Sequence, residues 1–203
     1  MGKWIAIGCF GLLVLAVLVV GGSLAGTYNS LVALDQKVQS QWAQVENVYQ
    51  RRADLVPNLV ETVRGAANFE KDTFTAVTEA RARVGQVNAG GTKNIPNDPA
   101  AFAKFQQAQD SLGASLSRLL VVVERYPDLK ATGNFSTLQS QLEGTENRIA
   151  VERMRFNEAA QAFNTKRNSF PTNMVAGMFG AKFNEKAYFK SQAGAETAPK
   201  VKF

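Results

Sequence analysis

Charged side chains in two segments are the residues of this sequence that could carry out chemistry. Glu46, Arg51 and Arg52 lie in the first segment. If the two segments belong to antiparallel helices, these three residues face the second segment. A cavity lined by the carboxylates could hold two metal ions, but such sites take a Glu-x-x-His pair from two helices, and the chain has no His. We therefore predict a structural layer of ion pairs that fixes helix register, because buried charges need partners. The second segment contributes Glu143, Glu146, Arg148, Glu152 and Arg153.

No other catalytic arrangement is evident in the sequence. The absence of His removes the commonest general base and the commonest metal ligand. The only cysteine, Cys9, lies in an apolar run, so neither a disulfide framework nor a thiolate metal site is expected. No Ser occupies a Gly-x-Ser-x-Gly motif, and Gly90-Gly91 lacks the Lys-Ser/Thr pair of a phosphate-binding loop. We predict a protein that is not an enzyme and has no cofactor, with an unrecognised catalytic site as the second alternative.

The C-terminal segment 169–203 is the remaining candidate for function. Its five Lys and two Glu give it +3 of the net charge of +6. Aromatic side chains can enter a membrane interface and lysines can meet anionic headgroups, so we predict a membrane-proximal surface. The alternative is that the apolar residues complete the core at the end of the bundle. Nucleic-acid binding is not expected, because it requires a dense basic face. The residues assigned to the membrane surface are Lys182, Lys186, Lys190, Phe179 and Phe183.

The first 27 residues predict a transmembrane anchor. No charged residue occurs between Lys3 and Asp35, and about 22 residues after Lys3 are almost all apolar or Gly. At ~1.5 Å per residue this run spans a hydrocarbon core of ~30 Å. Trp4 and Tyr28 stand at its ends, where interfacial aromatics belong. A removed signal peptide that ends at Ala25 is the alternative. Few charges flank the run, so its orientation in the membrane is open.

Apolar residues recur at steps of three and four through the rest of the chain, which indicates helices. The first continues from the anchor past Val60, with Pro57 producing a kink rather than a stop. A second is predicted over residues 70–87. Asp98 should cap a third that ends near residue 126, and a fourth begins near residue 134. These patterns predict an all-α protein, with an N-terminal transmembrane helix over 1–27 and an antiparallel up-and-down four-helix bundle over 28–168.

Several blocks of the sequence resemble the LemA family. They are the run WAQVENVYQRRADLVPNLV at 42–60, the run ERYPDLK at 124–130, the run LEGTENRI at 142–149 and the run SFPTNM at 169–174. The resemblance implies a bacterial single-pass membrane protein with a four-helix soluble domain. It implies no reaction and no catalytic residue. It also suggests a loose association with the membrane envelope and membrane compartments.

The anchor, the helical faces and the missing catalytic groups together predict a function. We expect a non-enzymatic scaffold or adaptor at the bacterial inner membrane, with one membrane pass. Long lateral helix faces favour self-association into homo-oligomers. Expected partners are membrane lipid, further copies of the chain or a membrane protein. The alternative function is a membrane-surface module that binds or shapes anionic lipid through the C-terminal segment.

Overall fold

The computed structural model describes residues 2–64, 71–92, 94–127 and 132–190, and helices account for most of them. No strand occurs within these ranges, so the predicted all-α class is confirmed. The elements in chain order are α1 (Gly2–Arg64), α2 (Lys71–Ala89), the 3-10 turn η1 (Ile95–Asn97), α3 (Pro99–Val123), α5 (Gly133–Asn168), α6 (Thr172–Met178) and the 3-10 turn η2 (Gly180–Phe183).

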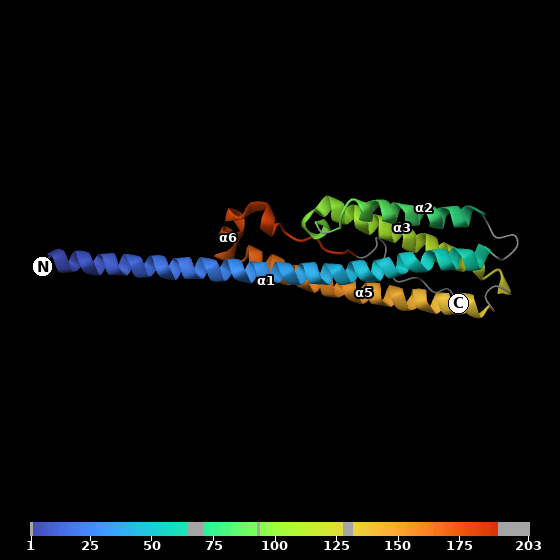
Figure 1. Cartoon of the computed structure of the whole chain (residues 1–203), viewed down its shortest axis with the longest axis horizontal. Coiled ribbons are helices and arrows are strands. Elements are labelled where there is room, and N and C mark those ends of the chain that lie inside the picture. Colours follow the sequence, from blue (N-terminus) through green and yellow to red (C-terminus); the bar gives the residue numbers. More distant parts are fainter. Residues whose placement is uncertain (1, 65–70, 93, 128–131, 191–203) are drawn as a thin grey trace, which may run out of the picture.

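Helix α1 is the longest element and has two different environments along its length. Its 63 residues extend about 95 Å at 1.5 Å per residue. Side chains from Ile7 to Gly26 are exposed, and this part projects beyond the rest of the molecule (Figure 1). It is the one helix among the described residues that is long and apolar enough to cross a membrane. From Leu31 onward, the same helix buries one face in the bundle.

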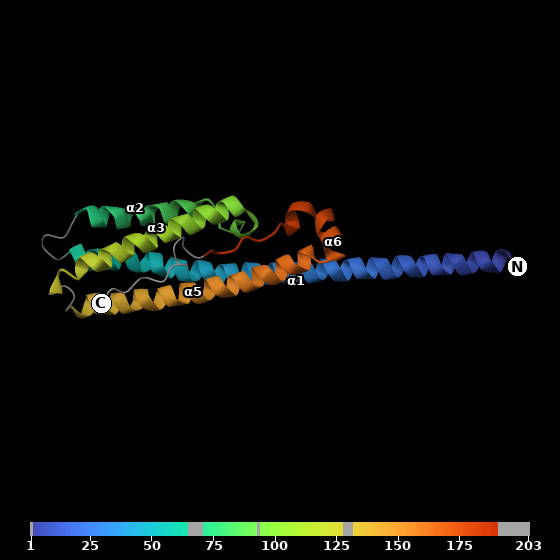
Figure 2. The same cartoon turned by 180° about the vertical axis from the view of Figure 1, so that it is seen from behind.

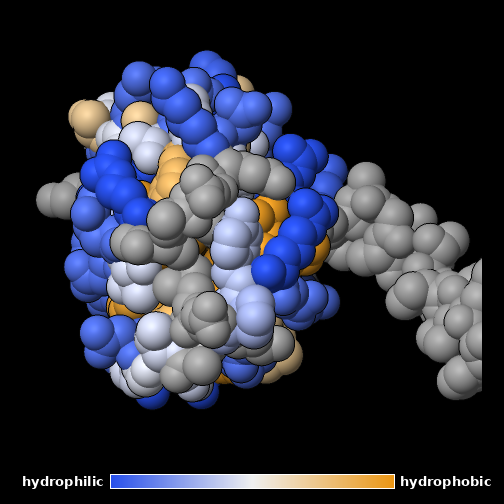
Figure 3. Space-filling model, turned by 90° about the vertical axis from the view of Figure 1, so that its right-hand side faces the viewer, coloured by the Kyte–Doolittle hydropathy of each residue, from blue (hydrophilic) through white to orange (hydrophobic). Residues whose placement is uncertain are grey.

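The body is an up-and-down arrangement of four helices, as predicted. Helix α5 lies alongside α1, and α2 lies alongside α3, in two opposite views (Figures 1 and 2). At the end far from the anchor, Leu59 of α1, Val77 of α2, Leu112 of α3 and Phe135 of α5 share one apolar cluster. Hydrophilic residues dominate the face seen from that end (Figure 3). The amphipathic pattern therefore places each apolar stripe in a common core.

The core nearer the exposed apolar part of α1 is aromatic and includes Phe183 and Phe189 of the C-terminal segment. The Trp42 ring packs edge-on against Phe105 and Phe156, with centroids 5.0 and 5.5 Å away. Phe183 and Phe189 belong to the same buried cluster. Aromatic pairs at such separations add stabilisation beyond the area they bury. Phe183 and Phe189 of the C-terminal segment therefore complete the core of the bundle, which is one of the two alternatives that the sequence leaves open.

Pro57 lies inside α1 and does not end the helix. The helix continues to Arg64, although Pro57 has no N–H to donate to the carbonyl of Ala53 four residues earlier. Arg81 of α2 fills the gap, because its Nε donates to the Ala53 carbonyl at 3.2 Å. The proline thus creates a docking point for α2. The predicted cap of α3 is also present, since the Asp98 carboxylate accepts from the backbone N–H groups of Ala100 and Ala101.

Candidate functional site

A buried guanidinium lies at the centre of the predicted ion-pair layer. Arg52 is 3% exposed, and its Nη1 donates to Glu146 Oε1 of α5 at 3.0 Å. Its Nη2 donates to both the backbone carbonyl and Oε1 of Gln109 on α3, at 2.9 and 2.6 Å. The guanidinium carbon also lies 5.0 Å from the centre of the Tyr49 ring. Arg52 therefore ties three helices together through one planar fork.

A second cation lies beside it on α5. Arg153 Nε donates to the Tyr49 hydroxyl at 2.6 Å, and its Nη2 donates to Asp110 Oδ1 at 3.0 Å. Burial raises the pKa of Tyr49, although the charges of Arg153 and Arg52 act against this shift. Burial also disfavours the Arg153 cation, but Tyr49 and Asp110 outweigh it and raise the pKa of Arg153. The pair is therefore a neutral phenol bound to a permanent cation.

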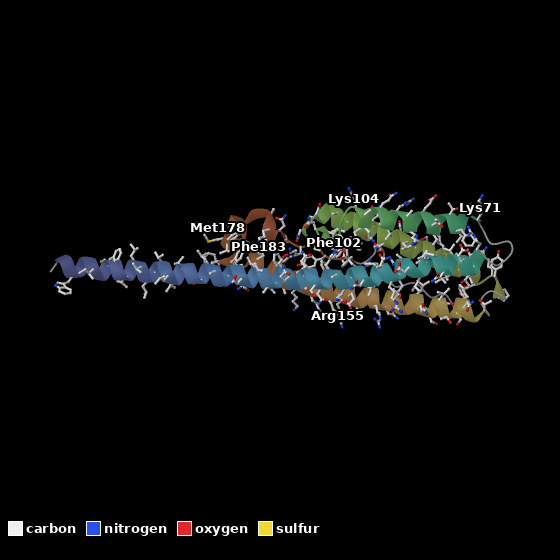
Figure 4. The ribbon with its side chains drawn as sticks, in the orientation of Figure 1. Lys71, Phe102, Lys104, Arg155, Met178 and Phe183 are labelled. Atoms are coloured by element: carbon white, nitrogen blue, oxygen red, sulfur yellow. The ribbon has the colours of Figure 1, made fainter. Side chains whose placement is uncertain are left out.

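The structure brings some of the predicted layer together and leaves other members outside it. Arg52, Glu146 and Arg153 lie at the junction of the helices. Glu152 instead pairs with Arg155 along α5. The side chain of Arg155 is labelled in Figure 4. The remaining predicted members are placed as follows: Glu46 has a buried Oε1 without a hydrogen-bond partner, Glu143 accepts from Gln139, and Arg51 and Arg148 are exposed.

Helix α3 also contributes to the layer, although only the first and last helices of the bundle were expected to form it. Gln109 of α3 accepts from Arg52, and Asp110 of α3 accepts from Arg153. A signal was present, because Gln109 interrupts the apolar stripe between Phe105 and Leu112. A polar residue at a core position needs a buried partner, and Arg52 is that partner.

A groove between α3 and α5 runs past this layer. It has a volume of about 670 Å³, and small residues such as Gly113, Ala114 and Ala150 form part of its wall. The two cations that border it, Arg52 and Arg153, already donate to protein acceptors. No group of three His, Cys, Asp or Glu residues in the described part of the chain could hold a metal ion. The charged side chains of this layer bond the helices to one another.

The C-terminal segment is bound to the bundle by a second polar cluster. The Lys186 side chain is fully buried, and its Nζ donates to Asp35 of α1 and to Asn97 of η1. The same Nζ lies 4.5 Å from the centre of the Phe163 ring. The amide of Asn164 bonds both backbone groups of Lys186, at 2.9 Å each. We call this set, Lys186 with Asp35, Asn97 and Asn164, the tail clasp.

These positions correct part of the predicted membrane surface. Lys186 and Phe183 are 2% and 1% exposed, so neither can meet lipid in this fold. Their assignment to a membrane surface is wrong, because Asp35 neutralises the lysine and Phe163 packs against the ring of Phe183. Phe179 is 46% exposed, and Lys182 and Lys190 are also exposed. Lys182 Nζ donates to the Tyr28 hydroxyl.

Comparison with known proteins places the chain in a family. The family model described as LemA family matches residues 41–203. The chain belongs to the LemA family. The match covers the charged layer, the groove and all of the tail clasp except Asp35, and it begins beyond the exposed apolar part of α1. The resemblance of the sequence blocks is thereby confirmed.

Relatives of this LemA-family chain include magnetosome proteins. Magnetosome protein MamQ 2 of Paramagnetospirillum magneticum is 26% identical over 91% of this chain and 72% of its own length. Magnetosome protein MamQ of Magnetospirillum gryphiswaldense is 26% identical over 84% of this chain and 67% of its own length. Protein LemA of Metamycoplasma hominis is 25% identical over 74% of this chain and 64% of its own length. None of these names denotes an enzyme. With the apolar start of α1, the relatives indicate a membrane-associated protein.

Proposed function

We propose that this LemA-family protein is a non-enzymatic scaffold of the bacterial inner membrane, with one membrane pass and a body that self-associates. The observation that supports this most is the continuity of α1. The apolar part and the bundle face belong to one helix from Gly2 to Arg64, with no linker between them. Because a helix is stiff over this length, the body cannot tumble freely relative to the anchor. It stands on the membrane with its sides toward its neighbours.

A candidate contact face for self-association lies on α5. Val151 and Met154 are exposed on α5, at 41% and 55%. They are one helical turn apart, so they share a face. Two apolar side chains are a small patch, but anchoring confines copies to two dimensions and raises their effective concentration. The proposal therefore requires only weak lateral contacts.

Cysteine crosslinking tests this proposal in the intact chain. The only cysteine is Cys9, so Cys9→Ala provides a cysteine-free background. Met154→Cys or Val151→Cys in that background should form disulfide-linked dimers in native membranes under mild oxidation. Thr78→Cys on the exposed face of α2 is the matched control, and we expect little dimer from it. Light scattering of the unmodified protein in detergent should show a mass above that of one copy.

Two results would count against self-association. One is a strictly monomeric mass across micromolar concentrations. The other is equal crosslinking at Met154 and Thr78, which would indicate random collision. Metal analysis and activity screening of the purified protein test the competing enzyme hypothesis. A stoichiometric metal or a turnover that is lost on replacing the groove residue Asp110 would favour it.

A further inference from the structure

Exposed apolar side chains gather on one short segment of the body. Beyond Leu24, eight large apolar side chains are exposed in the described part of the chain, and four of them fall between residues 170 and 179. Phe170, Met174 and Met178 are 80%, 62% and 76% exposed. Met174 and Met178 are four residues apart within α6 (Thr172–Met178), so they share one face of that helix, and Phe170 and Phe179 flank the helix on either side. We call Phe170, Met174, Met178 and Phe179 the α6 stripe.

The opposite face of α6 is used by the fold. Thr172, Val175 and Ala176 are buried, and they attach α6 to α1 and α5. The α6 stripe therefore points away from the core while its helix is held in place. In soluble proteins, a contiguous exposed apolar patch marks a contact with another surface.

The position of α6 identifies that surface. The Phe179 ring lies 4.7 Å from the ring of Tyr28, and Tyr28 follows Leu24 by four residues, or about 6 Å along the helix axis. The interfacial layer of a bilayer is about 5–8 Å thick on each side of its hydrocarbon core. If Leu24 ends the buried part of the anchor, Phe179 lies within that layer. The labelled Met178 projects from α6 toward the anchor end of α1, whereas Phe183 lies against α1 (Figure 4).

We propose that the α6 stripe inserts into the lipid interface of the same membrane that α1 crosses, and that it does so by apolar burial. This inference rests on the proposed membrane pass of α1. Segments of this kind enter the boundary between headgroups and acyl chains with their apolar face. Methionine suits such a site, because its flexible side chain adapts to an irregular surface. Lys182, beside Tyr28, is placed to reach headgroup phosphates from the same level.

Charge attraction by the described lysines Lys186 and Lys190 does not account for this contact. Lys186 is neutralised in the tail clasp. Lys190 follows Phe189, whose ring stacks on Trp42. Trp42 lies 18 residues beyond Leu24, about 27 Å along α1. That distance exceeds the Debye length of about 8 Å at physiological salt. Of the three predicted lysines, only Lys182 is close to the membrane.

Site-specific fluorescence in the full chain tests the proposal. An environment-sensitive dye is attached at Met178→Cys or Met174→Cys in the Cys9→Ala background, and the protein is reconstituted into vesicles. Met154→Cys is the matched control, because it replaces an exposed methionine on α5. The unmodified chain, labelled at Cys9, reports the anchor. Vesicles of neutral lipid and of neutral lipid with an anionic fraction are compared, with and without lipids that carry an interfacial spin label.

We expect the dyes at Met178 and Met174 to shift to shorter wavelength and to be quenched by the spin-labelled lipid. The dye at Met154 should stay solvent-like. Quenching at Met178 should appear in both vesicle types and persist at about 1 M salt, where the Debye length falls to about 3 Å. A Met178 dye as solvent-like as that at Met154, while Cys9 is quenched, would overturn the proposal and leave the anchor intact.

Other outcomes are equally decisive. A blue shift at Met178 without lipid quenching would mean that a second protein surface covers the stripe, which overturns the lipid contact. Loss of quenching at high salt would overturn the apolar mechanism. Absence of quenching at Cys9 would instead reject the membrane pass itself, and with it the proposed function. The failures of the two proposals are therefore distinguishable.

Discussion

At the residue scale, the Arg52 side chain bonds to two other helices, and the two sets of bonds contribute different amounts to stability. Its bond to Glu146 reaches a carboxylate whose side chain is 48% exposed, and exposed ion pairs contribute about 0–1 kcal/mol. Its bonds to Gln109 are buried on both sides. Leaving a buried polar group unpaired costs about 1–3 kcal/mol. The larger contribution should therefore come from the amide, not from the carboxylate.

A double-mutant cycle checks this ranking. Arg52→Met should lower the free energy of unfolding by roughly 1–3 kcal/mol, because Gln109 is left without its donor. The coupling energy between Arg52→Met and Gln109→Leu should exceed that between Arg52→Met and Glu146→Gln. Denaturant unfolding of all single and double variants provides the values. A larger coupling to Glu146 would show that the salt bridge dominates the layer.

Tyr49 makes stability depend on pH in the alkaline range. Burial raises its pKa in the folded protein, so the folded state holds the phenol proton more tightly than the unfolded chain, where the pKa is about 10. This contribution is complete below about pH 10 and is lost as the pH rises through the higher folded value. Unfolding free energy should thus fall more steeply above about pH 10 in the wild type than in Tyr49→Phe. Parallel slopes in the two proteins would contradict the assignment.

At the element scale, Pro57 links α1 to α2. The carbonyl that it frees on Ala53 accepts from Arg81. A hydrogen bond from a charged donor contributes about 1.5–3 kcal/mol, so Arg81→Met should be destabilising by an amount in that range. In a Pro57→Ala background, the new N–H satisfies the carbonyl within α1. The effect of Arg81→Met should then shrink, as thermal unfolding of the four proteins would measure. An unchanged effect would mean that Arg81 acts through other contacts.

The tail clasp joins the segment after α5 to α1 and η1, and its two charges are not equivalent. Lys186 is fully buried, whereas the Asp35 side chain is 21% exposed. Asp35→Ala leaves a buried ammonium without a carboxylate, which should cost about 3–5 kcal/mol. Lys186→Met removes the buried charge and should cost less. Unfolding free energies and tryptic cleavage after Lys182 measure the difference. The reverse order would show that Asp35 carries the larger desolvation cost.

The whole molecule combines a long helix with an apolar start and a body that the same helix helps to build. If α1 crosses the membrane as proposed, the number of residues between Leu24 and Tyr28 sets the distance of α6 from the bilayer, because α1 has no linker. This makes α1 a spacer whose length determines which side chains meet lipid. The hydrophilic residues that dominate the far end (Figure 3) are then held away from the membrane.

Lengthening this spacer gives a prediction for the whole molecule. Seven helical residues with alternating Glu and Lys, inserted between Gly26 and Thr27, should raise the body by about 10 Å. Quenching of a Met178→Cys dye by interfacial spin-labelled lipid should then fall. In a separate protein that carries the insertion and is labelled only at Cys9, quenching should stay constant. The same labelled protein without the insertion is the control. Unchanged quenching at Met178 would show that α1 bends or tilts to compensate.

Local pattern was sufficient to predict the helices, the cap at Asp98, the long apolar N-terminal helix and the family resemblance, because apolar spacing and charge-free length are properties of neighbouring residues. The partners of the buried charges depended on tertiary packing. Lys186 lies among aromatic residues in the sequence, as a lysine of a membrane surface would. Its partner Asp35 is 151 residues away in sequence, and only the contact between the two makes burial of the lysine favourable. Gln109 is polar but buried, and Met178 is apolar but exposed. Whether a side chain at either position is buried or exposed depends on which helix packs over it, and sequence spacing alone does not specify that neighbour.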